Sequence, residues 1–303
     1  MLIDVHHHAT TEALTARRAR AGLQAPPGMP AWTREIAVET MDSIGVTASV
    51  LSVPADVGWL PEHERAAAVR DVNDELAGIV AWAPQRFGAF ATIPLPDPDA
   101  ALAETARALD DLRLDGLCLL SSYAGVYLTD ERYAELLADW NRRRAVVFVH
   151  PILVAGPVAG LSPALLEGTF DTTRFATKLA ADRVLERYPD VRFVLPHTGG
   201  MVPYVTWRIA LNALQQGDFR VPVSREAIDR EIAVLDAFYY DTTLNLGPLP
   251  KLARADRILF GTDVPWANAD VLRLQREEVV DEATASGNAL RLFPRLAARL
   301  SGG

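Results

Sequence analysis

Cysteine is almost absent from this 303-residue chain, which contains Cys118 alone. A single cysteine excludes an intrachain disulfide and is compatible with a reducing compartment. Long hydrophobic runs are absent as well, and no apolar segment approaches the roughly 20 residues that cross a bilayer. The first predicted strand begins almost at Met1, which leaves no room for a secretory leader. We therefore expect a soluble, cytoplasmic protein.

Positive charge is in deficit, because 30 Lys and Arg residues face 39 Asp and Glu residues, for a formal net charge of −9. The resulting negative field disfavours nucleic acids and anionic membranes as partners, so a small-molecule substrate is the better expectation. Half of the residues are hydrophobic and 23% are charged. That balance is typical of a chain that buries a large core.

Short apolar runs alternate with longer amphipathic stretches along the whole chain, without internal repeats or low-complexity segments. This alternation is typical of successive βα units around a parallel sheet. We predict eight strands, at Leu2–Val5, Ala48–Val53, Phe87–Ile93, Gly116–Leu120, Val146–Val149, Arg192–Leu195, Phe238–Tyr240 and Arg257–Phe260. The clearest helical patterns cover Thr33–Ile44, Asp99–Leu112, Asp130–Arg143, Thr172–Tyr188 and Ala269–Leu300.

Eight βα units close naturally into a (β/α)8 TIM barrel, and the length suits one such domain over residues 1–303. A doubly wound open sheet is the alternative. The first βα turn lacks the Gly-rich phosphate loop that is the usual nucleotide-binding evidence for that fold. The barrel is therefore the preferred fold class.

Four of the six histidines follow predicted strands, where a barrel places its catalytic groups. His6 and His8 come directly after the first strand, and residues two apart in an extended chain point to the same side, so both can bind one ion. A solvated turn or a purification remnant is the alternative for three adjacent histidines. His150 ends the fifth strand and His197 the sixth. Each alone would more often be structural, but their concentration indicates a site.

Asp263 emerges from the eighth strand inside a Gly- and Pro-containing turn, where an ordinary role would be to cap a helix. With imidazoles arriving from strands one and five, it is better interpreted as the anionic ligand of a His-rich site for a borderline-soft divalent ion. We predict His6, His8, His150 and Asp263 as the ligands. The ion is expected to be zinc, with manganese as the alternative, and to keep an open coordination position.

Lysine is scarce, with Lys178 inside a helical pattern and Lys251 after strand seven. Two-metal barrels of this general kind bridge their ions through a carboxylated lysine at a strand end. Strand four ends instead in Leu119-Leu120-Ser121-Ser122. We therefore expect one ion per chain.

The order of these motifs resembles the amidohydrolase superfamily, and within it the branch of aminocarboxymuconate semialdehyde decarboxylase and the 6-methylsalicylate and related hydroxybenzoate decarboxylases. The H-x-H pair, the His-Pro at His150, the H-x-G-G at His197 and the G-T-D-x-P at Asp263 occur in that family's order. Thr198 and Thr262 depart from its common residues without removing a catalytic group. The resemblance covers nearly the whole chain, including Arg86–Phe90, Asp171–Arg174 and Tyr239–Thr242.

The resemblance implies that His6, His8, His150 and Asp263 bind the metal and that His197 acts as an acid or base beside it. It also implies a homodimer, for which the helices between strands six and seven are a candidate interface. The implied reaction is non-oxidative decarboxylation of a small aromatic or muconate-type acid, with His197 or Asp263 handling the proton. A shared fold does not by itself settle the reaction.

Substrate contacts call for a cation to bind the carboxylate and aromatic groups to flank a planar ring. Asp241, after strand seven, could orient Arg174 or His197. Ordinary alternatives exist for each: a surface arginine, an aromatic residue that packs a loop, or a capping acid. The loops Thr10–Pro30 and Ile152–Thr169 are expected to determine specificity. The candidate contacts are Arg174, Arg208, Trp32, Phe170, Trp266 and Asp241.

Two other functions remain open from the sequence. In a metal-dependent hydrolase of a lactone, an amide or a related substrate, the ion lowers the pKa of bound water toward about 7 and the hydroxide attacks a carbonyl. A binding or scaffolding protein that keeps the site as a relic is the third class, and the joint presence of every ligand and of His197 disfavours it. Carbon dioxide release separates the first two functions, and metal analysis tests the third.

Overall fold

The computed structural model describes residues 1–303 apart from 25–27, 154–159, 245–248, 278, 280 and 303. Eight parallel strands, each paired with the next along the chain, form one sheet in the order β1 to β8. The predicted (β/α)8 barrel is confirmed. The strands are β1 Ile3–His8, β2 Ala48–Ser52, β3 Phe87–Thr92, β4 Gly116–Leu120, β5 Val146–His150, β6 Arg192–Leu195, β7 Tyr239–Asp241 and β8 Ile258–Leu259.

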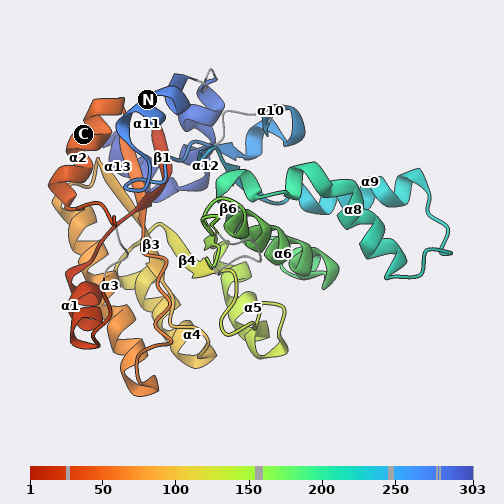
Figure 1. The fold of residues 1–303 in the computed structure, drawn as a ribbon, viewed down its shortest axis with the longest axis horizontal. Helices are drawn as coiled ribbons and strands as arrows, with labels where there is room; N and C mark the ends of the chain where they lie inside the picture. The colour runs from red at the N-terminus through yellow and green to blue at the C-terminus, as the bar shows by residue number, and fades with distance from the viewer. Residues whose placement is uncertain (25–27, 154–159, 245–248, 278, 280, 303) are drawn as a thin grey trace.

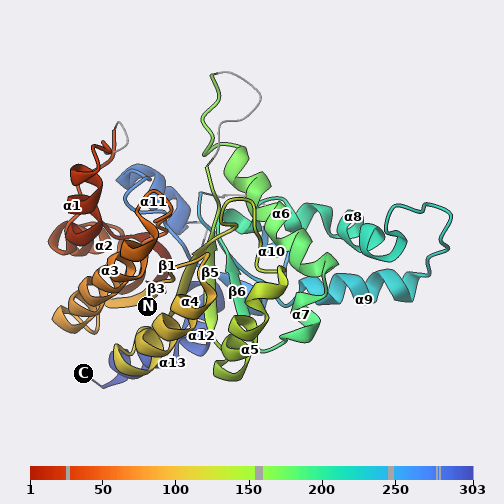
Figure 2. The same ribbon diagram turned by 90° about the horizontal axis from the view of Figure 1, so that it is seen from below.

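Helices surround this sheet, and α8 and α9 extend together well beyond it (Figures 1 and 2). In the described part of the chain, no helix combines the length and apolarity that a membrane crossing requires. The α-helices are α1 Glu12–Arg20, α2 Arg34–Ile44, α3 Glu62–Trp82, α4 Pro98–Ala106, α5 Ala134–Arg143, α6 Glu167–Ala181, α7 Val184–Arg187, α8 Val202–Gln215, α9 Arg225–Leu235, α10 Leu249–Leu252, α11 Ala269–Glu277, α12 Asn288–Leu292 and α13 Pro294–Ser301. The short π and 3-10 segments are η1 Arg107–Asp111, η2 Glu131–Tyr133, η3 His197–Gly199, η4 Ala255–Arg257 and η5 Ala283–Gly287.

The predicted strands agree with the structure to within a few residues, whereas the long predicted helices are interrupted. The helix predicted over Ala269–Leu300 is broken, and one break lies at Pro294, which lacks the N–H that continues a helix and opens α13 instead. The helix predicted over Thr172–Tyr188 begins already at Glu167 and is interrupted at Arg183, whose φ is 58°.

Apolar side chains fill the barrel in two layers. The interior layer contains Val50, Phe90 and Phe148 from different strands, and it also includes Phe293, between α12 and α13, and Leu296 of α13. A larger layer fills the space between the outer face of the sheet and the helices. The interior is therefore a packed core, and polar side chains have room only at the carboxyl ends of the strands.

β1 contains a one-residue bulge. Asp4 pairs with Ser49 on β2, whereas His7 pairs with Leu51, so three steps along β1 match two steps along β2. Side chains alternate between the faces of a strand, and one extra residue shifts that alternation by one position.

The bulge decides which side chains of β1 face the barrel axis. Ile3 and Val5 belong to the interior core below it. Beyond it the His6 ring lies 4.9 Å from the ring of Phe148 in the same core, and the His8 ring lies 4.9 Å from that of His6. Both the apolar half and the histidine half of one strand thus face inward. Without the bulge, odd and even positions would lie on opposite faces.

Close packing of the sheet predicts a contrast between two glycines. A Cβ on Gly116 in β4 would lie 2.6 Å from the carbonyl oxygen of Val146 and 2.9 Å from the Phe90 ring, whereas Gly78 in α3 has nothing within 4 Å. We expect Gly116→Ala to lower the free energy of unfolding by about 1–3 kcal/mol. Gly78→Ala should raise it by about 0.5–1 kcal/mol. Urea denaturation measures both, and equal shifts would contradict the predicted packing.

Candidate active site

Five polar side chains converge at the carboxyl-terminal edge of the barrel, from four different strand ends. His6 and His8 lie within β1 itself rather than after it, which corrects the predicted strand boundary. His150 ends β5, His197 follows β6 and Asp263 follows β8. One ligand atom of each of His6, His8 and Asp263 lies within 4.8 Å of the others, and the same holds for His6, His150 and His197.

The shortest distances in this cluster join nitrogen and oxygen atoms that suit a metal ion. The Nε2 atoms of His6 and His8 are 3.1 Å apart. Asp263 Oδ1 lies 3.3 Å from Nε2 of His6 and 3.1 Å from Nε2 of His8. Three donors at such spacing can bind one ion together.

The opposite ring nitrogen of three histidines is already engaged. His6 Nδ1 lies 2.7 Å from Asp241 Oδ2, His8 Nδ1 lies 3.1 Å from Ser52 Oγ, and His150 Nδ1 lies 2.9 Å from the carbonyl oxygen of Pro151. The Asp241 carboxylate and the Pro151 carbonyl can only accept, which favours a proton on Nδ1 of His6 and His150 and leaves Nε2 to face the cluster, and the Ser52 hydroxyl can accept from His8 in the same way. Metal-binding histidines in proteins are held in this way.

Two carboxylates control the charge of His6. Burial by itself lowers the pKa of this imidazole, but the negative charges of Asp241 and Asp263 and their hydrogen bonds outweigh that effect and raise the pKa to about 10. Burial would likewise raise the pKa of Asp263, yet the His6 cation and hydrogen bonds from the neighbouring histidines hold it well below its usual range. Asp263 is therefore an anion at neutral pH.

His8 and His150 have lowered pKa values and are poor bases. Burial and the positive charges of neighbouring histidines hold the pKa of His150 well below its ordinary value. Burial lowers the pKa of His8 too, against the opposing hydrogen bond from Asp263. Neutral imidazoles beside an anionic carboxylate form a donor set with affinity for a divalent cation.

The segment that carries His197 has an unusual backbone. Residues His197, Thr198, Gly199 and Gly200 all have positive φ, between 54° and 74°. A Cβ on Gly199 would lie 2.4 Å from the Tyr240 ring. Glycine is required where the loop passes so close to β7, and the strain at two non-glycine residues is typical of a functional site.

His197 differs from the anchored histidines. Its Nε2 lies 3.7 Å from Asp263 Oδ2, and 19% of its side chain remains exposed. Among the described residues, its Nδ1 has no hydrogen-bond partner. Fewer hydrogen bonds therefore hold this ring than hold those of His6, His8 and His150.

Asp241 is fully buried, and protein donors occupy its carboxylate. Besides His6 Nδ1, it accepts hydrogen bonds from the backbone N–H of Thr243 at 3.0 Å and of Thr198 at 3.4 Å. The structure thus places Asp241 behind His6 rather than at an exposed position where a substrate or Arg174 would reach it. Reasoning from the sequence missed this role, although the position of Asp241 after strand seven was its available signal.

Most of the other predicted substrate contacts are exposed, and the backbone N–H of Trp266 donates to the carbonyl oxygen of Asp263 at 2.7 Å. Arg174 and Phe170 are exposed on α6, Arg208 is exposed on α8, and Trp266 is exposed after β8. Trp32 is partly buried and donates its indole N–H to His7 Nε2 at 3.2 Å. Of the two loops predicted to determine specificity, residues 25–27 and 154–159 lie outside the described part of the chain.

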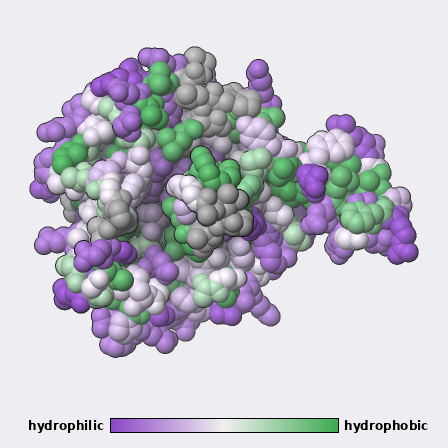
Figure 3. All heavy atoms as spheres, viewed as in Figure 1, coloured by the Kyte–Doolittle hydropathy of each residue, from purple (hydrophilic) through white to green (hydrophobic). Residues whose placement is uncertain are grey.

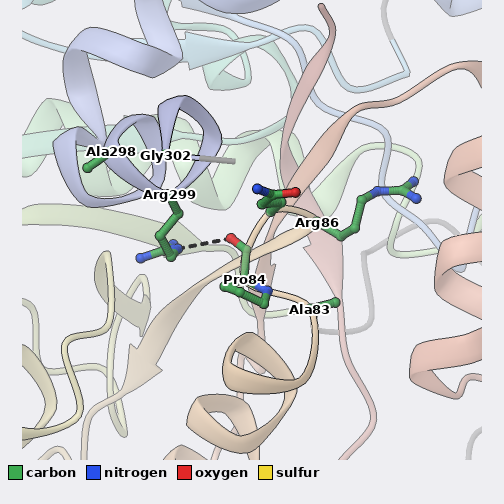
Figure 4. A pocket seen from close by; sticks show the side chains of 7 residues that line it. Ala83, Pro84, Arg86, Ala298, Arg299 and Gly302 are labelled. Carbon is green, nitrogen blue, oxygen red and sulfur yellow. Dashed lines mark hydrogen bonds between the residues drawn. The ribbon is translucent and has the colours of Figure 1, made fainter.

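A separate surface hollow lies between the turn before β3 and α13 (Figure 4). Arg299 donates from Nε to the carbonyl oxygen of Pro84 at 3.1 Å across it. This is the amino-terminal end of the barrel, where side chains contribute to stability rather than to catalysis. The hollow is therefore not part of the candidate active site.

Comparison with known proteins agrees with this geometry. Residues 3–295 match the amidohydrolase family model. The chain belongs to the amidohydrolase family. It is 35% identical to a 6-methylsalicylic acid decarboxylase from Aspergillus aculeatus, over 98% of this chain and 97% of that protein. The family and branch predicted from motif order are confirmed.

Solved structures of decarboxylases share the fold. A 5-carboxyvanillate decarboxylase from Sphingomonas paucimobilis superposes with a TM-score of 0.84 at 21% identity, over 97% of this chain and 98% of that chain. A dihydroxybenzoic acid decarboxylase from Polaromonas, with bound manganese and the inhibitor 2-nitroresorcinol, superposes with a TM-score of 0.79 at 25% identity, over 97% and 96% of the two chains.

Proposed function

We propose that this chain is a divalent-metal-dependent, non-oxidative decarboxylase of a small aromatic carboxylic acid. The observation that carries the proposal is the set of three clustered imidazoles, His6, His8 and His150, whose Nδ1 atoms are engaged, completed by an anionic Asp263. Relatives that match nearly the whole chain are named decarboxylases. The family resemblance and the donor chemistry thus support the same reaction.

The residues that would hold the ion are His6, His8, His150 and Asp263. We expect one ion per chain, because Lys178 lies within α6 and forms an ion pair with Asp182, and β4 ends in leucine. No lysine of the described strand ends is placed to carry a bridging carboxylate. Nitrogen-rich donors favour zinc, and the carboxylate with an open position also suits manganese, which a related decarboxylase binds.

The proposed reaction breaks the bond between the ring carbon and the carboxylate carbon of the substrate. When bound, a divalent ion would supply Lewis-acid stabilisation of the negative charge that develops on the substrate. The bonding electron pair stays on the ring carbon, which then takes a proton. His197 is suited to deliver that proton from Nε2, because its ring is partly exposed at the edge of the cluster and this atom lies 3.7 Å from Asp263 Oδ2.

The remaining candidate contacts are assigned to substrate recognition. Arg174 or Arg208 would anchor a carboxylate or phenolic oxygen, and Trp32, Phe170 and Trp266 would flank the ring. Because Cys118 is the one cysteine of the sequence, no intrachain disulfide is needed and the chain is compatible with a reducing compartment. We propose the cytoplasm as its location.

Release of carbon dioxide tests the proposed reaction. The metal-loaded protein should convert a member of a hydroxybenzoate panel, including 6-methylsalicylate and 2,6-dihydroxybenzoate, to the corresponding phenol with one carbon dioxide for each molecule consumed. Chromatography of the phenol and gas detection measure this, and chelator-treated protein is the control. Hydrolysis of lactones or amides without carbon dioxide would instead favour the hydrolase.

Metal content separates the roles of two histidines. We expect His197→Ala to keep one ion per chain while turnover falls by about 100-fold to 10,000-fold, the usual effect of removing a general acid or base. His150→Ala should lose the ion, because it removes a ligand that the Pro151 carbonyl holds in place. Elemental analysis measures both. If His197→Ala loses its ion as completely as His150→Ala, then His197 is a ligand.

The arm formed by α8 and α9 supports the predicted homodimer. Figure 3 shows apolar residues on its surface, and Tyr204, Trp207 and Phe219 are exposed there, Phe219 to 86%. Exposed aromatic residues on a projecting element are typical of a protein interface. We therefore propose that this arm contacts a second copy of the chain.

Light scattering at micromolar concentration checks the dimer. The unmodified chain should give twice the mass of one chain, and the double variant Trp207→Ser, Phe219→Ser should give monomers. Trp82→Ser is the matched control, because Trp82 is exposed on α3, away from the arm. A monomeric unmodified chain, or a control that dissociates as well, would contradict the assignment.

A further inference from the structure

Asp4 has a buried carboxyl group that belongs to neither group of candidate metal ligands. Its Oδ1 accepts hydrogen bonds from the backbone N–H of His6 at 3.0 Å and of Thr262 at 3.1 Å. Its Oδ2 accepts from the hydroxyl of Thr262 at 2.7 Å and from that of Ser49 at 3.4 Å. His7 Nδ1 lies 3.4 Å from the same oxygen. No Lys or Arg in the described residues pairs with it.

The first of these contacts lies inside the bulge of β1. A bulge leaves one residue out of the regular ladder, and a buried N–H that lacks an acceptor is costly. The Asp4 side chain supplies the acceptor for His6, two residues further along the strand. Asp4 therefore stabilises the local geometry that turns His6 and His8 toward the barrel axis.

The second set of contacts reaches the turn after β8. Thr262 directly precedes Asp263, whose φ of 64° is left-handed. The Asp263 N–H donates to the carbonyl oxygen of His6 at 2.8 Å, and the Thr262 hydroxyl lies 3.3 Å from the same carbonyl. The backbone around Asp263 is thus hydrogen-bonded both to the side chain of Asp4 and to the carbonyl of His6, whose own N–H donates to Asp4.

We propose that Asp4 is a positioning residue of the metal centre, which joins the two halves of the ligand set without touching the ion. One half is the H-x-H pair on β1, and the other is Asp263 after β8. Asp4 sets the spacing of about 3 Å between the His6 and His8 nitrogens and Asp263 Oδ1. If the bulge were lost, a one-residue slip would turn the histidines to the other face of the sheet. The inference rests on the metal site of the proposed function.

Asp4→Asn in the full chain tests this role. The amide keeps one oxygen for the two backbone N–H groups but replaces the acceptor that faces the Thr262 hydroxyl. We expect zinc and manganese affinity, measured by competition with a chromophoric chelator, to fall about 10-fold to 100-fold, as for other groups that orient metal ligands. Circular dichroism of the chelator-treated variant should still show the folded chain.

Asp115→Asn is the matched control, because it makes the same change in another buried carboxylate. Asp115 accepts from Arg299 at 2.8 Å and from the backbone N–H of Ala89 at 3.1 Å, at the amino-terminal end of the barrel. This variant should lose thermal stability while its metal affinity stays within about twofold of the unmodified chain. Equal weakening of metal binding in both variants would show a general loss of stability and overturn the proposal.

Thr262 provides a second pair of variants, which decides the matter if Asp4→Asn does not fold. Thr262→Val removes the hydroxyl that donates to Asp4 and should weaken metal binding. Thr262→Ser keeps this hydroxyl and should bind the metal like the unmodified chain. If Asp4→Asn folds and its metal affinity is unchanged, the role of Asp4 is overturned while the proposed function stands. If Asp4→Asn does not fold, an unchanged metal affinity of Thr262→Val has the same meaning. An unmodified chain that binds neither metal refutes the proposed function instead.

Discussion

Closure of the barrel between its last and first strands is the constraint on which the rest of this structure depends. β8 comprises only Ile258–Leu259, so the seam relies on hydrogen bonds beyond the regular ladder. The Val5 N–H donates to the Phe260 carbonyl at 2.9 Å, and the His8 N–H donates to the Val264 carbonyl at 2.7 Å. Because three of the four proposed metal ligands come from these two chain segments, the contacts that close the barrel also assemble the site.

Electrostatics imposes a second requirement at the same place. Burying several imidazoles together is unfavourable if more than one is charged, and the low pKa of His150 reflects that repulsion as well as burial. Asp241 and Asp263 balance the charge by favouring protonation of His6. A divalent ion would replace that proton and interact with the same carboxylate, so the arrangement suits metal binding better than an empty polar core.

The two ends of the barrel serve different purposes. Phe293 and Leu296 seal the amino-terminal end with apolar packing, and the ion pair of Arg299 with Asp115 lies near the same end. At the carboxyl-terminal end the strands stop, and the strained segment from His197 to Gly200 passes close to β7. Strain and buried polarity can persist there because the packed core below holds the strand ends in place.

Much of this protein follows from its sequence, since alternating apolar runs indicate eight βα units and the order of H-x-H, His-Pro, H-x-G-G and Asp263 indicates the family. Local patterns could not show the bulge, because pairing of Asp4 with Ser49 and of His7 with Leu51 depends on a neighbouring strand. They also could not assign Asp4 and Asp241, whose partners Thr262 and His6 lie more than 200 residues away in the chain. The local sequence therefore indicates which residue types can bind the metal. Their convergence and their charges depend on tertiary contacts, which join β1 to the turn after β8 and β1 to β7.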